Sequence, residues 1–256
     1  MFLKRTPGYL LLAIGLMFGA VDGTGAEYLV RTSTEARTIL HFSANKDAVQ
    51  KLLPTGWTST PGTGDLKDAN IGIVLIDGLA AESAEGNPVP NQSRLAVLFV
   101  PAKNEQSGAS GAMIVGGFTA QPEDAPGAYG VYVPAKVTVT RSSRSDGSEA
   151  TTVEESWDVS TNAGDQLLFA VSYERGMVAR THIEPRIYSA ARPEFYRIDK
   201  IDQVSEVVHS VVDDTKQAGV EFSGSGPQFS KVFDGNERLV AVTSIPICYR
   251  RIFLPD

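Results

Sequence analysis

The chain has 256 residues, of which 30 are acidic and 23 are basic, so its formal net charge at pH 7 is −7. This surplus of negative charge argues against nucleic acid and anionic lipid as partners, since both repel an acidic protein. Cys248 is the single cysteine, which excludes an intramolecular disulfide and leaves burial to hold the fold together.

The first residues have the features of a secretory signal peptide. Lys4 and Arg5 precede an apolar run over 9–18, and small residues follow up to Ala26, which is the order typical of export signals. The run is shorter than the ~20 apolar residues that a membrane-spanning helix needs. We therefore expect a signal peptide over 1–26, cleavage after Ala26, and a mature protein that is periplasmic or secreted and free of the membrane.

Most of the mature chain consists of short β-type runs separated by turns. Apolar and β-branched residues cluster in strand-length segments bounded by glycine, proline or polar residues. The expected strands cover 36–42, 71–76, 95–100, 112–119, 131–139, 151–159, 166–173, 193–201 and 239–253. The strands over 151–159 and 166–173 predict a hairpin, and Gly116 and Gly117 predict a bulge or a bend.

Two segments have helical spacing instead. Residues 48–53 place apolar side chains on one helix face, with Ser43 or Asn45 available as N-cap and Pro54 ending the run. A second set of apolar residues predicts another helix, which Gly219 would close. This set consists of Val204, Val207, Val208, Val211 and Val212.

The order of these elements favours a mainly β fold. Nine or ten strands with short turns and only two short helices are typical of an antiparallel sheet rather than of alternating βαβ units. Closure of the sheet removes exposed edges, and glycines inside strands allow the bends that closure needs. We expect a single domain over 27–256, built as a closed or nearly closed antiparallel β-barrel or cone.

No residue pattern indicates a metal or a cofactor. His41, His182 and His209 lack the spacing of metal ligands; His209 precedes Asp213 by four residues, but a solvated helix face is the simpler interpretation. Cys248 lies in an apolar strand, where a lone cysteine is more often a small core residue than a nucleophile. The expected partner is therefore a small molecule, bound without a metal or a cofactor.

Lys136 is the candidate catalytic residue. It lies between valines in a strand, preceded by Tyr129 and Tyr132. If its side chain points into a barrel, loss of hydration lowers its pKa, as an amine nucleophile requires. If the side chain points outward, Lys136 is an ordinary solvated lysine with a pKa of ~10.4.

Three segments carry a resemblance to a known family. Residues 48–56 (AVQKLLPTG) end in Leu-Pro-x-Gly, residues 70–77 and 95–101 are apolar strands, and residues 128–136 (AYGVYVPAK) contain an aromatic residue, glycine, proline and lysine. Together they resemble the acetoacetate decarboxylase superfamily, whose members are cone-shaped β-barrels. The resemblance implies a central cavity and, where the active site is complete, decarboxylation of a β-keto acid through a lysine Schiff base.

The sequence departs from this family at the catalytic positions. The family has two lysines directly after the proline, the first being the nucleophile, whereas Pro134 is followed by Ala135 and then Lys136. Lys136 thus matches the second, assisting lysine, unless two extra residues before Pro134 have shifted the register. The family also has a glutamate just before the strand that begins here at Arg94, where this chain has no carboxylate. We therefore expect no decarboxylation of acetoacetate.

Two functional hypotheses follow. In the first, the barrel binds a small apolar or acidic ligand, with Tyr129, Tyr132 and either Arg94 or Lys136 supplying polar contacts. In the second, the protein is a carbon–carbon lyase that uses Lys136 as an imine-forming amine on an oxo acid. Borohydride trapping separates the two, because it reduces an imine to a stable adduct.

Overall fold

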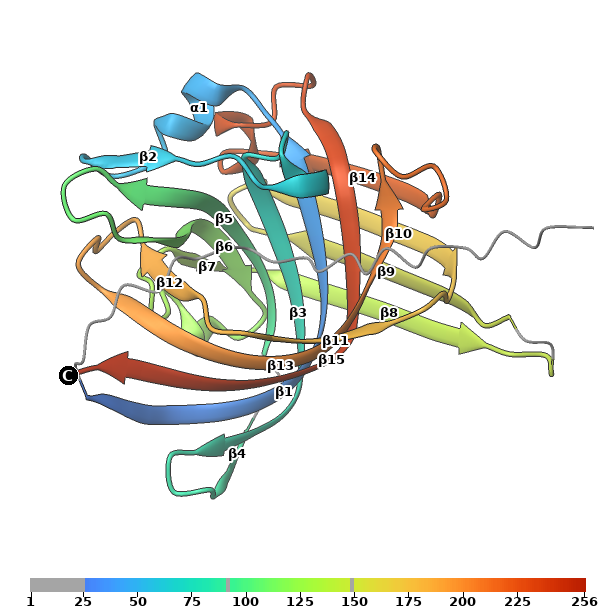
Figure 1. Cartoon of the computed structure of the whole chain (residues 1–256), viewed down its shortest axis with the longest axis horizontal. Coiled ribbons are helices and arrows are strands. Elements are labelled where there is room, and N and C mark those ends of the chain that lie inside the picture. Colours follow the sequence, from blue (N-terminus) through green and yellow to red (C-terminus); the bar gives the residue numbers. More distant parts are fainter. Residues whose placement is uncertain (1–25, 91–92, 148–149) are drawn as a thin grey trace, which may run out of the picture.

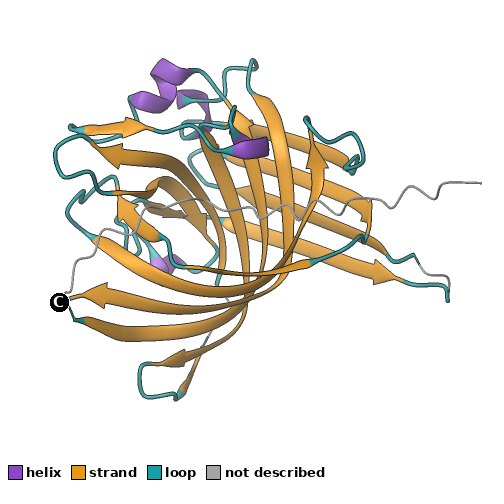
Figure 2. Cartoon of the chain, viewed as in Figure 1, coloured by secondary structure: helices purple, strands orange, loops and turns teal. Residues whose placement is uncertain are grey.

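A computed structural model of the chain describes residues 26–256 apart from 91–92 and 148–149 (Figure 1). The predicted signal peptide lies outside the described residues, except for Ala26. Strands dominate the fold, as Figure 2 shows, and they form two sheets. None of the helices in the described part of the chain is long and apolar enough to cross a membrane.

The larger sheet closes into a seven-stranded barrel. Neighbouring barrel strands are antiparallel except for the parallel pair β12–β6. Around the barrel the order is β5 (Arg94–Asn104), β3 (Ile71–Ser83), β1 (Glu27–Ser43), β15 (Arg238–Pro255), β13 (Tyr196–Ser210), β12 (Arg186–Ser189) and β6 (Ser110–Thr119), which pairs again with β5. The prediction of a mainly β, closed barrel is confirmed.

Four short strands extend the barrel sheet. They are β2 (Trp57–Ser59) beside β5, β4 (Pro88–Val89) beside β3, β7 (Tyr132–Pro134) beside β6 and β11 (Ala179–Ile183) beside β13. The register between β5 and β6 shifts next to Gly116, so the predicted irregularity is present there. The start of β1 lies beside the end of β15. There Asp256 N–H donates to the Ala26 carbonyl over 2.9 Å.

The smaller sheet packs against the outside of the barrel. It has four antiparallel strands in the order β14 (Gly219–Ser225), β10 (Gln166–Glu174), β9 (Thr152–Ser160) and β8 (Lys136–Arg144). Strands β9 and β10 form the predicted hairpin. One face of this sheet is buried against the barrel, with Trp157 and Phe169 in the shared core, and the opposite face is exposed.

Strand β3 shows why the barrel strands read as continuous apolar runs. Ile73 and Leu75 are buried in the core between the two sheets, whereas Val74 and Ile76 line the inside of the barrel. Since side chains alternate across a strand, both faces of β3 are covered by protein. The barrel therefore has an outer core under the smaller sheet and a separate interior.

The first predicted helix is confirmed and the second is wrong. Helix α1 (Lys46–Gln50) begins after Asn45, whose side chain accepts hydrogen bonds from the N–H groups of Asp47 and Ala48. The valines over 204–212 lie instead in β13 and the turn after it. Two register shifts in β13, after Val204 and after Val207, break the strand alternation, so the valine spacing imitates a helix while β-branched residues favour the strand. Three short 3-10 turns are also present, over Gly64–Leu66, Pro122–Asp124 and Phe229–Lys231.

The segment around Lys136 is divided between the two sheets. We expected one strand over 131–139, but β7 ends at Pro134 and β8 begins at Lys136. Ala135 N–H donates to the Thr119 carbonyl over 2.8 Å, which holds the crossing point against the barrel. The chain passes here from the barrel sheet to the smaller sheet.

Candidate functional site

Two adjoining cavities lie along the inside of the barrel. The inner chamber has a volume of about 170 Å³, and the vestibule has a volume of about 490 Å³. Both are lined by Ile76, Tyr129, Tyr132 and Arg250. These four residues therefore form the junction between the two cavities.

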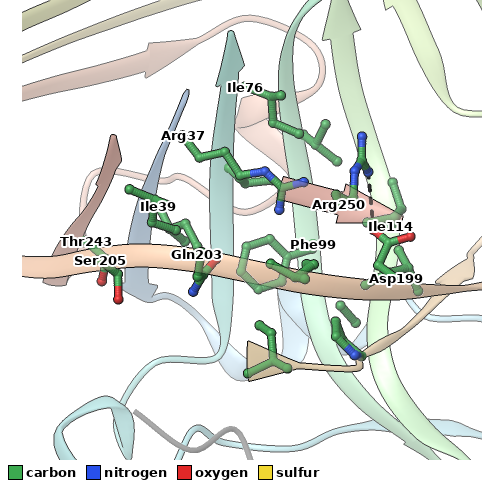
Figure 3. Close-up of a pocket in the computed structure, with 18 of the residues that line it drawn as sticks. Arg37, Ile39, Ile76, Phe99, Ile114, Asp199, Gln203, Ser205, Thr243 and Arg250 are labelled. Carbon is green, nitrogen blue, oxygen red and sulfur yellow. Dashed lines mark hydrogen bonds and ion pairs between the residues drawn. The ribbon is translucent and has the colours of Figure 1, made fainter. Parts of the chain in front are cut away.

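The inner chamber is mainly apolar, with a polar strip on one wall (Figure 3). Val74, Phe99 and Ile114 from β3, β5 and β6 line the apolar wall. Polar side chains come from β13 and its neighbours, namely Asp199, Gln203, Ser205, Thr181 and Thr243. Such a cavity suits a ligand with an apolar body and a few polar groups.

A buried network of charges lies at the junction. Glu35 Oε1 lies 2.5 Å from Arg250 Nη2, and its Oε2 accepts from Arg37 Nε over 2.7 Å. Arg250 Nη1 also donates to Asp199 Oδ2 over 3.2 Å, the ion pair drawn in Figure 3. Strands β1, β13 and β15, which are neighbours in the barrel, bring these groups together.

The protonation states in this network follow from burial and pairing. Burial alone would raise the pKa of Glu35, but Arg250 and Arg37 outweigh it and lower the pKa to about 2. Burial raises the pKa of both Tyr129 and Tyr132. At neutral pH the site therefore contains an ionised Glu35 and two protonated phenols.

Several buried polar atoms around the cavities accept or donate no hydrogen bond within the described part of the chain. They include Arg37 Nη2, Arg197 Nε, Asp199 Oδ1 and Thr181 Oγ1. Arg37 Nη2 lies 2.6 Å from Glu35 Oε2, a contact that pairs the charges without hydrogen-bond geometry. Because a buried polar atom without a partner costs about 1–3 kcal/mol, these atoms mark where a polar ligand would gain most.

Two glycines leave the space that the Tyr132 ring occupies in the wall. A Cβ atom on Gly127 would lie 2.5 Å from the Tyr132 ring, and one on Gly117 would lie 2.9 Å from it. Gly127 also has a φ of +73°, in the left-handed region that favours glycine. The ring fits here because neither Gly127, in the turn before β7, nor Gly117, in β6, has a side chain.

The structure brings together only part of the predicted site. Tyr129 and Tyr132 line both cavities, and their contact with a ligand stays a prediction. Arg94 lines neither cavity and pairs with Asp77 over 3.2 Å. Lys136 begins β8 on the exposed face of the smaller sheet, opposite Ser160. Among the described residues that line the two cavities, none is a lysine.

Sequence reasoning missed the charged residues of the junction. Glu35 and Arg37 lie two residues apart in a strand that continues into the apolar run Ile39–Phe42. Charged residues that share one face of an otherwise buried strand indicate a polar interior. That signal was present in β1, but its partners Asp199 and Arg250 lie far away in the sequence and only the barrel brings them close.

His41 should make the protein less stable in mild acid. It lies in the barrel wall with its ring nearly perpendicular to that of Phe99, and burial lowers its pKa to about 4 from 6.5. The stability that neutral His41 contributes is complete above pH 6.5 and is lost as the pH falls to 4, by at most about 3 kcal/mol. Urea unfolding at several pH values should show this loss in the wild type and a smaller loss in His41→Gln.

The matched control is His182, which is exposed on β11. His182→Gln should leave the pH dependence as in the wild type. Equal pH dependence in the wild type and in His41→Gln would contradict the assignment to His41.

Comparison with known proteins places this fold. No protein-family model matches the chain, and no curated protein matches it in sequence. The structure of the enduracididine biosynthesis enzyme MppR complexed with pyruvate is similar, with a TM-score of 0.56, 10% identity and 88% of each chain covered. Acetoacetate decarboxylase from Legionella pneumophila subsp. pneumophila str. Philadelphia 1 is similar with a TM-score of 0.50 and 11% identity, over 89% of this chain and 86% of the decarboxylase.

These similarities show the fold. The chain is built as an acetoacetate decarboxylase-like β-barrel. A second MppR structure, complexed with the condensation product of pyruvate and imidazole 4-carboxaldehyde, is similar to the same degree, with a TM-score of 0.56 and 10% identity.

Proposed function

We propose that this protein binds a small organic acid at the junction of the inner chamber and the vestibule. The observation that carries the proposal is the set of arginines that line the two cavities, of which Arg197 Nε is buried without a hydrogen-bond partner in the described structure. A guanidinium N–H in a site of low polarity binds a carboxylate more strongly than it binds water. The ligand's carboxylate is the group that fits these donors.

The charge of the cavity supports an anionic ligand. The lining residues include four arginines and three carboxylates, which leaves one formal positive charge in excess; they are Arg31, Arg37, Arg197 and Arg250, with Glu35, Asp124 and Asp199. His41 adds no charge at neutral pH, because burial lowers its pKa to about 4. A ligand with a single negative charge makes the enclosed site neutral, which lowers the cost of burying its charges.

The comparisons agree with this proposal. MppR, which has a similar fold, forms a complex with pyruvate, a small oxo acid. A protein with this fold can thus bind a small acid. The likeness concerns the fold, so the identity of the acid bound here rests on the residues of this chain.

In this proposal the protein binds its ligand without an imine. Imine formation needs an amine beside the ligand, and the described residues that line the cavities include no lysine. Incubation with pyruvate or acetoacetate followed by borohydride should therefore give no adduct. A stoichiometric adduct on Lys136, absent in Lys136→Ala, would favour the alternative of a carbon–carbon lyase.

Calorimetric titration tests the binding proposal. Pyruvate and acetoacetate should bind, and Arg197→Met should weaken binding roughly tenfold or more, the usual effect of losing a hydrogen bond to a charged group. Arg180→Met is the matched control, because the Arg180 side chain is 77% exposed and pairs with Asp202 on the outside of the barrel. Absence of binding to either acid, or an equal loss in both variants, would contradict the proposal.

We also propose that the protein is exported and that the signal is removed after Ala26. Strand β1 begins at Glu27, so cleavage there leaves every described strand intact. The mass of the protein recovered from the periplasm or the medium should correspond to a chain that begins at Glu27. A mass that retains residues 1–26 would overturn both the cleavage site and the location.

A further inference from the structure

The Asp199 carboxylate has an oxygen that a ligand with only a carboxylate group would leave without a hydrogen-bond donor. Its side chain is buried, with 4% of the residue exposed, and it lines the inner chamber. Oδ2 accepts from Arg250 Nη1, whereas Oδ1 accepts no hydrogen bond from any residue in the described ranges. A carboxylate oxygen can only accept, so a hydrogen-bond donor on the ligand would satisfy Oδ1.

The donor must lie close to the ligand's own carboxylate. Arg197 and Asp199 are two residues apart on β13, so their Cα atoms are about 6–7 Å apart. Arg197 lines the vestibule and offers a buried, unpartnered Nε–H, and Asp199 lines the inner chamber. A ligand that meets both side chains therefore carries its acid group and its donor close together, and neighbouring atoms, as in a 2-substituted acid, are the simplest arrangement.

The inner chamber beyond Asp199 accepts an apolar group. Its volume of about 170 Å³ is close to that of an engineered apolar protein cavity of about 150 Å³ that binds benzene. Ile39, Phe99 and Ile114 line this space. A phenyl ring or a short branched chain matches both its size and its surface.

The charge balance distinguishes between the two simplest donors. An ammonium group beside the carboxylate would make the ligand a zwitterion and would leave the excess positive charge of the cavity in place. A hydroxyl group keeps the ligand a monoanion, which neutralises the formal charge of the lining. A hydroxyl group therefore supplies the hydrogen bond to Asp199 Oδ1 and leaves the ligand with the single negative charge that balances the lining.

We infer that the ligand is a 2-hydroxy acid with a small aromatic or branched apolar side chain. Its carboxylate meets Arg197, its hydroxyl group donates to Asp199 Oδ1, and its side chain fills the inner chamber. This inference rests on the proposed function, because it names the class of acid that the same site binds.

A series of related acids tests the inference on the unmodified protein. By calorimetry, 3-phenyllactate should bind at least tenfold more tightly than 3-phenylpropanoate, which lacks the hydroxyl group, because a hydrogen bond to a charged group is lost. It should also bind at least tenfold more tightly than lactate, which lacks the ring. 2-Methoxy-3-phenylpropanoate, whose ether oxygen cannot donate, should bind no better than 3-phenylpropanoate.

One variant assigns the preference to Asp199. In Asp199→Asn the ratio of the two affinities, for 3-phenyllactate and 3-phenylpropanoate, should fall to about threefold or less, since a neutral amide accepts a hydrogen bond less strongly than a carboxylate. Asp202→Asn, the same change on the outer face of β13 where Asp202 pairs with Arg180, should keep the ratio. Circular dichroism checks that both variants are folded, and the ligand series on the wild type remains decisive if one is not.

The outcomes separate this inference from the proposed function. If pyruvate binds but 3-phenyllactate and 3-phenylpropanoate bind equally, the hydroxyl assignment is wrong and the acid-binding function stands. If phenylalanine binds more tightly than 3-phenyllactate, the donor is an ammonium group and the inference is overturned. If no acid binds, pyruvate included, the proposed function fails as well.

Discussion

Replacing Glu35 with alanine is expected to lower the free energy of unfolding by about 3–5 kcal/mol, the usual cost of removing one partner from a buried ion pair. Glu35 is 2% exposed and pairs with both Arg37 and Arg250. Without it two guanidinium groups remain inside the barrel, and only Arg250 keeps a paired carboxylate, that of Asp199. Urea unfolding at pH 7 measures the effect.

The pH dependence identifies the carboxylate itself. The pKa of Glu35 is about 2 in the folded protein, against 4.5 as its ordinary value. Its contribution to stability is therefore complete above pH 4.5 and is lost as the pH falls toward 2. The difference between the wild type and Glu35→Gln should shrink over that range.

Glu85 provides the control for this experiment. It is exposed in the turn after β3 and accepts a hydrogen bond from Ser83. Glu85→Ala should leave the free energy of unfolding essentially unchanged. Similar losses from both substitutions would show that the junction network does not stabilise the fold in the way described.

Replacing Trp157 with alanine is expected to cost about 3–5 kcal/mol, the usual range for removing a fully buried indole. Trp157 is 1% exposed and lies in the core between the two sheets. Its indole N–H donates to Glu155 Oε1 over 2.6 Å, and Glu155 also accepts from Thr38 of β1 over 2.8 Å. The indole thus supports both the packing and the polar contact between the smaller sheet and the barrel.

The shape of the unfolding curve is as informative as its midpoint. If residues 27–256 form one cooperative domain, Trp157→Ala should still unfold in a single transition at lower urea concentration. Leu168→Ala, on the exposed face of β10, should cost less than about 1 kcal/mol. Two separate transitions in Trp157→Ala would mean that the two sheets are independent units.

The strands could be predicted because the pattern of apolar residues within each segment reflects which of its faces are buried. The runs at 71–76 and 95–100 are apolar at every position because both faces of these barrel strands are covered, and the hairpin after Thr152 alternates because only one of its faces is covered. The prediction of a helix over 204–212 was wrong. The valines have helical spacing in the sequence, but β13 accommodates that spacing through its register shifts. A bulge that arises from pairing with a distant strand cannot be predicted from local periodicity.

The site was harder to predict than the fold. Lys136 was predicted as a site residue from its residue type, and Tyr129 and Tyr132 were predicted because they precede it. The chain changes sheets between Tyr132 and Lys136, so these residues do not form one site. Arg250 is about 215 residues from Glu35, its partner. No spacing rule connects such residues, so the centre of the cavity becomes visible only when the barrel is closed.

The pairing of β1 with β15 also determines when the protein can fold. These strands come from opposite ends of the described chain and pair along their length, from Glu27 with Pro255 to Ser43 with Arg238. The barrel therefore cannot close until β15 has been synthesised, and this pairing requires a loop closure that spans most of the described residues. Folding should accordingly be slow for a protein of this size, because the barrel depends on a pairing between strands far apart in the sequence.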